Sequence, residues 1–152
     1  LRLLPRAGAT SSPVATRVNG RWYELEPNPM GMERVRVDLG PDRGALRYVK
    51  TGAEKQIGFG LGNQVEGTFP ETHYYGRRIG TPAGREYRCL ASAAWVEDHK
   101  LDLLVYIVDD YLGTLRASLS FTGDEVGVRM TKVAEWFLDD YEGFAGGRAE
   151  AG

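Results

Sequence analysis

The chain is poor in the residue types that build disulfides, metal sites and membrane spans. It has one cysteine, Cys89, so an intrachain disulfide is excluded, and the small and apolar neighbours of Cys89 predict a buried thiol. It has two histidines, His73 and His99, and neither has the cysteine partners of a zinc site. No stretch approaches the roughly 20 apolar residues that span a bilayer. The formal net charge of -2 gives no electrostatic reason to expect nucleic acid or an anionic membrane as a partner.

Motifs of common catalytic and cofactor sites are also missing. Ser92, in CLASAAW, fits neither the G-x-S-x-G of α/β-hydrolases nor the S-x-x-K of serine β-lactamases. The acidic segments 108–110 and 138–142 lack the ordered oxygen ligands of a calcium loop, and we expect them to be solvated. The glycines of IGFGLG, residues 57–62, lack the spacing and the following helix of a dinucleotide loop. We therefore expect no catalytic centre, metal or cofactor here, and the glycines indicate a bend or a close approach of another segment.

The composition favours one compact β domain. The chain has 152 residues, enough to bury a core without a metal or disulfide. Hydrophobic residues make up 42% and charged residues 26%, as in ordinary globular proteins. Twenty glycines, eight tyrosines and three tryptophans favour many turns and aromatic-bearing strands over a helical bundle.

Alternating apolar and polar residues predict a series of strands joined by short turns. The clearest case is MERVRVDL, in which Val35, Val37 and Leu39 share one face. The region 63–84 is the least regular, and we expect a longer loop or a short broken strand there. Strands are predicted over 20–26, 32–39, 45–50, 56–62, 85–96, 101–108, 114–121 and 125–133.

Two further patterns define the architecture. The strand that follows the turn at 97–100 is apolar on both faces towards its end, which predicts a sheet closed on itself or covered by a partner. The segment AEWFLDDYEGF, residues 134–144, spaces its aromatic residues as in a short helix, with Gly143 as its C-cap. Together these patterns predict an all-β, antiparallel up-and-down barrel of about eight to ten strands with a short C-terminal helix.

The ends of the chain differ in composition from this body. Residues 1–16 contain Pro5 and Pro13 among small and hydroxyl residues, which predicts a linker-like arm. The barrel domain is predicted over 17–147, and residues 148–152 are predicted to form a disordered tail. The first residue is a leucine, which suggests that the chain begins within a longer polypeptide.

Four stretches of the chain carry a family resemblance: NGRWYELEPNPMGMERVRVDLG, QIGFGLG, CLASAAWVEDHKLDLLVYIVDDYLGTLRASLSF and VGVRMTKVAEWFLDDYEGFAGG. From about Asn19 to Gly147, they resemble the C-terminal domain of serine hydrolases of the β-lactamase and penicillin-binding-protein type. That domain is a lipocalin-like barrel, and the catalytic serine and lysine of such hydrolases belong to the domain before it. The resemblance therefore implies a non-catalytic domain whose partner is a serine hydrolase domain in cis.

A second resemblance is to lipocalins themselves. Gly20-Arg21-Trp22 is similar to their G-x-W motif, and Asp110-Tyr111 is similar to part of their T-D-Y motif. Arg129 resembles the arginine that covers the tryptophan in that fold, which implies a structural contact between Trp22 and Arg129. Four aromatic residues could line a ligand cavity or fill the barrel core: Trp22, Phe59, Trp95 and Tyr106.

Two functions remain open from the sequence. The first is an accessory domain that shapes access to a neighbouring hydrolase active site or holds subunits together in a homo-oligomer. The alternative is a free-standing carrier of a small apolar ligand inside the barrel. A third class, an enzyme in its own right, would need a convergent set of reactive groups, and the sequence shows none.

Overall fold

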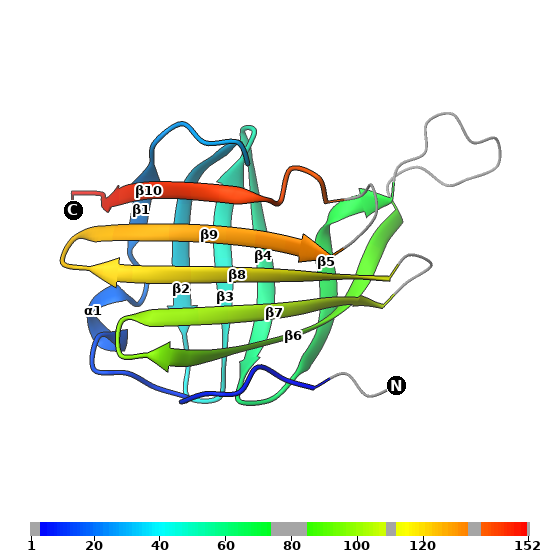
Figure 1. Ribbon diagram of the computed structural model, residues 1–152, viewed down its shortest axis with the longest axis horizontal. Coiled ribbons are helices and arrows are strands. Elements are labelled where there is room, and N and C mark those ends of the chain that lie inside the picture. Colours follow the sequence, from blue (N-terminus) through cyan, green and yellow to red (C-terminus); the bar gives the residue numbers. More distant parts are fainter. Residues whose placement is uncertain (1–3, 74–84, 109–111, 134–137, 152) are drawn as a thin grey trace.

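The computed structural model describes residues 4–73, 85–108, 112–133 and 138–151. These residues form ten strands and, before them, one short helix (Figure 1). The elements are α1 (Ala15–Val18), β1 (Trp22–Leu25), β2 (Met32–Leu39), β3 (Arg43–Lys50), β4 (Ala53–Leu61), β5 (Val65–His73), β6 (Arg85–Glu97), β7 (Lys100–Val108), β8 (Leu112–Thr122), β9 (Glu125–Val133) and β10 (Gly143–Ala149).

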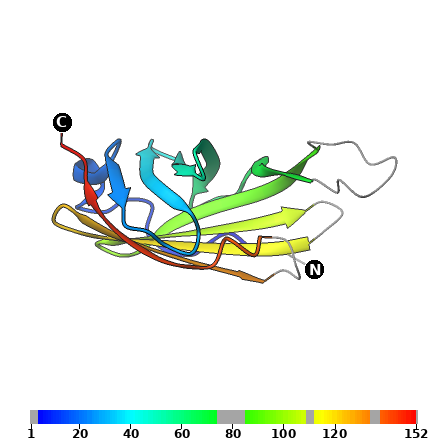
Figure 2. The ribbon, with the colours of Figure 1, turned by 90° about the horizontal axis from the view of Figure 1, so that it is seen from above.

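The strands close into a barrel, which confirms the predicted fold class. Antiparallel pairs join neighbouring strands from β1 to β4 and from β5 to β10, and β1 also pairs with β10. A short parallel contact joins β4 to β6 through Gly60 with Ser92 and Leu61 with Ala93. The ring therefore contains nine of the ten strands, and β5 is an additional strand on the edge of β6. The barrel is flattened into two facing layers, with β7 to β9 running across β2 to β4 (Figures 1 and 2).

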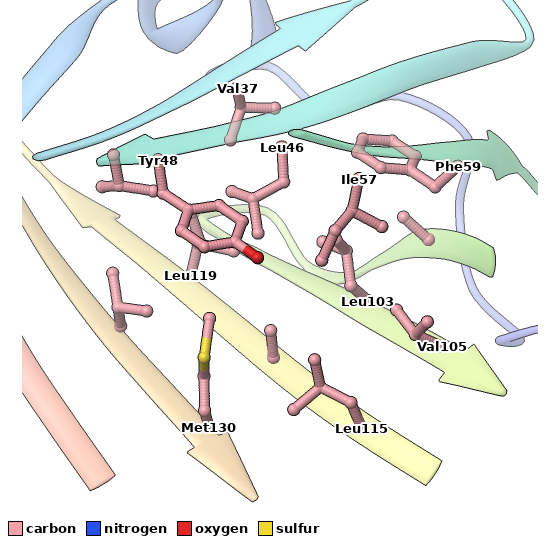
Figure 3. Packing of buried hydrophobic residues seen from close by; sticks show 14 of the residues in the cluster. Val37, Leu46, Tyr48, Ile57, Phe59, Leu103, Val105, Leu115, Leu119 and Met130 are labelled. Atoms are coloured by element: carbon pink, nitrogen blue, oxygen red, sulfur yellow. The ribbon is translucent and has the colours of Figure 1, made fainter. Parts of the chain in front are cut away.

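The core fills the space between these two layers. Because side chains alternate along a strand, every second residue of the amphipathic strands points inward. Figure 3 shows side chains of the two layers that face each other: Val37, Leu46, Tyr48, Ile57 and Phe59 from one layer, and Leu103, Val105, Leu115, Leu119 and Met130 from the other. All of these residues are buried. Each such side chain contributes about 1.5–3 kcal/mol of transfer free energy to folding.

The glycines of IGFGLG lie where the barrel closes. Phe59 and Leu61 point into the core, as their alternation predicts. A Cβ atom on Gly60 would lie 2.2 Å from the carbonyl oxygen of Asn63, so only glycine lets the turn after β4 fold back this closely. Gly62 has a φ of +81°, a left-handed conformation that glycine adopts without strain.

The segment predicted as a linker-like arm packs on the outside of the barrel. Ala9 pairs with Trp95 through two backbone hydrogen bonds of 3.0 and 2.8 Å. The backbone N–H of Arg6 donates to Ser92 Oγ at 2.8 Å, and the Arg6 guanidinium pairs with Asp102 at 3.0 Å. The facing layer of the closed barrel buries the inner face of β6 and β7, and the arm packs on part of their outer face. This arrangement explains why β7 is apolar on both faces towards its end.

The C-terminal segment differs from the predicted helix. Residues 134–137 lie outside the described residues, Leu138 to Asp140 form a turn, and β10 begins at Gly143. Arg148 and Ala149, which we expected in a disordered tail, belong to β10 and pair with β9 and β1, respectively. The physical reason is ring closure, because β1 and β9 both need a strand between them to satisfy their backbone hydrogen bonds.

We predict that Gly60→Ala destabilises the fold by about 1–3 kcal/mol, because the added methyl group overlaps the backbone of the Gly62–Gln64 turn. The matched control is Gly58→Ala in the same strand, where a Cβ atom would meet nothing nearer than 4.0 Å. That change should be neutral or stabilise by up to about 1 kcal/mol. Urea unfolding of both variants measures the difference. Equal midpoints would contradict the close approach at Gly60.

Candidate ligand-binding site

The four aromatic residues expected at a ligand cavity divide between the two sides of the barrel wall. Phe59 and Trp95 lie inside, within the hydrophobic core. Trp22 and Tyr106 lie on the outer wall, because each alternates with inward neighbours that are buried. The Tyr106 hydroxyl donates to the carbonyl oxygen of Leu4 in the arm at 2.9 Å. Of the four residues, Phe59 and Trp95 therefore lie in the barrel interior, and the other two do not.

Trp22 is covered by arginines of β2 and β3 rather than by Arg129. The guanidinium carbon of Arg34 lies 4.3 Å from the centre of the Trp22 ring, and those of Arg47 and Arg36 lie at 5.5 and 5.8 Å. Arg129 instead lies 5.5 Å from the ring of Phe144, its pairing partner on β10. The physical reason is strand order, since β10 separates β9 from β1. The T-D-Y-like pair Asp110-Tyr111 lies outside the described residues.

The interior wall is apolar over most of its length. Small side chains, Ala91 and Ala93 on β6 and Ala117 on β8, alternate there with larger aliphatic and aromatic ones. One hydroxyl on this wall, that of Tyr23, is buried without a hydrogen-bond partner among the described residues. Burial raises the pKa of Tyr23 above its ordinary value. Such a lining disfavours charged groups, because burial of an unpaired charge is costly.

Polar groups gather at one end of the interior, where sequence reasoning expected none. The hydroxyl groups of Tyr48 and Tyr141 lie 2.8 Å apart, and the Tyr141 hydroxyl donates to Glu71 Oε2 at 2.6 Å. Lys55 Nζ lies 3.3 Å from the same carboxylate oxygen and donates to the carbonyl oxygen of Pro70 at 3.0 Å. The chain of hydrogen bonds thus connects β3, β4, β5 and the turn before β10. The alternation in β3 could have indicated these polar groups, because Tyr48 and Lys50 lie on the same inward face as Leu46.

Two more lysines enter this end of the barrel. Lys50 pairs with Asp140, and Lys132 Nζ lies 2.6 Å from Asp139 Oδ1. Lys50 follows Tyr48 on the inward face of β3, and Lys132 follows Met130 on the inward face of β9. The two aspartates are adjacent in the chain, so the two lysines approach the same turn.

Burial changes the acidity of the groups around this cluster. Loss of hydration raises the pKa of Tyr48 and of Tyr141 well above that of an ordinary phenol, because the charged form is excluded from the interior. The same effect raises the pKa of the Cys89 thiol to about 11. Cys89 is buried, as its neighbours in the sequence predict. All three groups therefore remain protonated at neutral pH.

A groove of about 1500 Å³ lies on the opposite side of the wall, over the outer faces of β8, β9, β10 and β1. Its lining mixes charges of both signs, among them Glu24, Arg129 and Arg148. The half-exposed ring of Phe144 lies against Gly127 on its floor. This groove suits hydrated polar groups better than an apolar molecule.

Neither a metal cluster nor a membrane-spanning helix is found in the described residues. No group of three or more histidine, cysteine, aspartate or glutamate side chains in these residues is arranged to hold a metal ion. No helix among the described elements is long and apolar enough to cross a membrane.

Solved structures with a similar fold include a fatty acid-binding protein, a fatty acid transporter and a fluorescent protein. A fatty acid-binding protein from the brain of Drosophila melanogaster matches with a TM-score of 0.51 and 18% identity, covering 87% of this chain and 99% of that chain. The REP1-NXSQ fatty acid transporter matches with a TM-score of 0.53 and 10% identity, covering 90% and 98%, respectively. A mutant of the fluorescent protein UnaG matches with a TM-score of 0.51 and 12% identity, covering 91% and 99%. At these identities the likeness shows the fold alone.

These comparisons correct the resemblance to the C-terminal domain of β-lactamase-type hydrolases. No protein-family model and no curated protein matches the chain. The structures that share its fold are free-standing barrels, because the match covers nearly the whole of each. Short motifs such as G-x-W reflect requirements of the barrel and do not identify a hydrolase domain.

We predict that Phe59→Ala costs about 3–5 kcal/mol of folding free energy, because it empties a fully buried position. Trp22→Ala should cost about 1–2 kcal/mol, since the indole lies on the outer wall beside arginine side chains. Thermal melts of the two variants give the order. A larger loss for Trp22→Ala would contradict the placement of Trp22 outside the core.

We also predict that stability declines in alkaline solution. Cys89 has its pKa raised from 9.0 to about 11, so its contribution is complete below pH 9 and is lost as the pH rises towards 11. The loss is on the order of 2 kcal/mol. The raised pKa values of the two buried tyrosines add a steeper loss above pH about 10.

Urea unfolding at pH 8 to 11 measures this decline. Cys89→Ala should reduce the loss of stability that begins at about pH 9. Tyr48→Phe should reduce the steeper loss above about pH 10. Tyr106→Phe, which removes a hydroxyl from the outer wall, is the matched control and should leave the profile unchanged. An identical profile in Cys89→Ala would show that the thiol does not contribute.

Proposed function

We propose that this protein is a carrier that holds a small apolar ligand inside the barrel. The observation that carries the proposal is the closed ring of strands whose inner face is apolar except at one end. An apolar molecule in such an interior gains about 25 cal/mol for each Å² of apolar surface removed from water, less the cost of its lost freedom. The carrier function also agrees with the fold shared with fatty acid-binding and transport proteins.

The position of Ser92 supports binding rather than hydrolysis. Ser92 is fully buried on the outer face of β6, and its Oγ accepts the backbone N–H of Arg6. Among the described residues, Ser92 Oγ has no hydrogen bond to a histidine or lysine that could activate it as a nucleophile.

Access to the interior is easiest where the wall has the fewest backbone hydrogen bonds. Among the described strands, β4 and β5 follow each other in the chain without a hydrogen-bonded ladder between them. Lys55 of β4 bridges this junction through its contacts with Pro70 and Glu71 of β5. Side-chain contacts separate more readily than a strand ladder, so this junction and the adjacent polar end form the proposed route for the ligand.

We predict that 1-aminoanthracene, a neutral apolar fluorophore, binds the protein at one saturable site. Ala117→Phe projects a ring from β8 into the interior and should weaken this binding at least about tenfold, because it occupies ligand volume. Ala117→Leu is a milder filling variant and should weaken binding less.

The matched control is Ala45→Phe, which places the same ring on the outer face of β3. It should leave the affinity unchanged. Far-ultraviolet circular dichroism checks that each variant folds. Equal affinity for the wild type and for a folded Ala117→Phe would place the probe outside the barrel and contradict the carrier function.

A further inference from the structure

We infer that the ligand carries an uncharged hydrogen-bond acceptor, such as a ketone oxygen, and that the hydroxyl group of Tyr23 donates to it inside the barrel. This inference rests on the proposed carrier function and names one chemical group of the ligand. The observation behind it is a buried hydroxyl group whose hydrogen has no acceptor among the described residues.

The burial of Tyr23 is nearly complete. Its side chain points inward from β1 into the core, and the residue is 1% exposed. The hydroxyl oxygen is itself buried, so bulk water does not replace the missing partner. A buried hydroxyl group without a partner costs free energy that a phenylalanine of the same shape would not. The empty barrel therefore carries this cost, and a ligand that accepts the hydrogen removes it.

The neighbours of Tyr23 in the barrel wall offer no side-chain acceptor. Val35 lies opposite it on β2, and Ala149 lies opposite it on β10. On β8, the ring centre of Phe121 lies 5.7 Å from that of Tyr23. None of these three side chains contains an oxygen or nitrogen atom.

Arg21 is a polar neighbour of the ring, but it cannot accept the hydrogen. Its guanidinium carbon lies 5.7 Å from the ring centre of Tyr23, and the group donates to Asp124 Oδ1 at 3.2 Å. A guanidinium group has N–H donors and no acceptor. Burial raises the pKa of Tyr23, and the charges of Arg21 and Arg17 only oppose this shift. The phenol therefore stays protonated at neutral pH, and its hydrogen remains available however closely Arg21 approaches.

The same surroundings favour an uncharged acceptor. A carboxylate buried beside Tyr23 would need a counterion, and Arg21 is already paired with Asp124, whose side chain is 72% exposed. An uncharged oxygen atom needs only the hydrogen bond that Tyr23 offers. A ligand group that only donates, such as an N–H, would leave the hydrogen of Tyr23 unpaired.

Aromatic side chains continue from Tyr23 into the core. The ring centre of Phe121 lies 6.2 Å from that of Trp95, so the three rings form one continuous group. Aromatic rings favour tilted and offset contacts with one another. A flat aromatic ketone is therefore a suitable probe, because it can contact these rings while its oxygen accepts from Tyr23.

Three tricyclic probes of nearly the same shape test the inference on the full chain. 9-Fluorenone has an acceptor oxygen, carbazole has an N–H donor, and fluorene has neither. Competition with 1-aminoanthracene gives their affinities, after the affinity of 1-aminoanthracene for each variant has been measured directly. Tyr23→Phe should reduce the affinity of 9-fluorenone about threefold to tenfold, because it removes one hydrogen bond. It should change the affinities of carbazole and fluorene by less than about twofold.

Urea unfolding without ligand gives an independent measurement. Tyr23→Phe removes a hydroxyl group that has no acceptor, so its midpoint should equal or exceed that of the wild type. The matched comparison is Tyr48→Phe, which removes a hydroxyl group 2.8 Å from that of Tyr141 and should lower the midpoint. A similar decrease in Tyr23→Phe would show that its hydroxyl group already has a partner in the empty barrel, and the inference would be overturned.

Tyr106→Phe is the control for binding, because its hydroxyl group lies on the outer wall and donates to Leu4. It should change none of the three affinities. If Tyr23→Phe weakens all three probes equally, or none of them, the inference is overturned, while saturable binding of 1-aminoanthracene still supports the carrier function. If 1-aminoanthracene does not bind at one saturable site, the carrier function itself fails.

Discussion

Closure of the strand ring is the constraint on which the rest of the structure depends. The ring has its fewest strand pairings at two places. Strand β1, which pairs with both β2 and β10, is only four residues long, and β4 contacts β6 through only two residue pairs. Because each backbone group in the ring must find a partner, these links decide local conformation even where the sequence favours another. At the β4–β6 contact, the chain adopts a left-handed conformation at Gly62 and folds back closely over Gly60. At the other contact, the glycine-rich segment Gly143–Ala149 forms strand β10 beside β1.

The sequence predicts the fold better than it predicts the site. Strands such as β2 and β7 carry a strong alternation, so their existence and their inward faces follow from local pattern alone. β10 has no such pattern, because three of its seven residues are glycines, and only its two neighbours make it a strand. The cluster at the polar end depends on a contact between Tyr48 and Tyr141, which lie 93 residues apart in the chain. No local signal encodes a contact of that separation.

The two faces of the wall separate two kinds of chemistry. Outside, arginines lie over Trp22 and pair with partly exposed carboxylates, and such contacts are screened by water and contribute little individually. Inside, a few polar groups sit against an apolar core, where each needs a defined partner. The sequence motif around Trp22 therefore describes how the wall is built. The polar contacts at one end of the interior are made instead by inward residues of β3 and β9 and by the turn before β10.

One edge of β6 is shared by three separate segments of the chain. β5 pairs with it up to Ala91, β4 pairs with Ser92 and Ala93, and Ala9 of the arm pairs with Trp95. The arm thus acts as a protective cover for the last part of that edge. Removal of residues 1–7 would leave Ala9 in place to pair with Trp95. Removal of residues 1–9 would expose the backbone N–H and C=O of Trp95. An unpaired sheet edge is a template for strand pairing between molecules, and the arm pairs a part of the β6 edge that would otherwise be open.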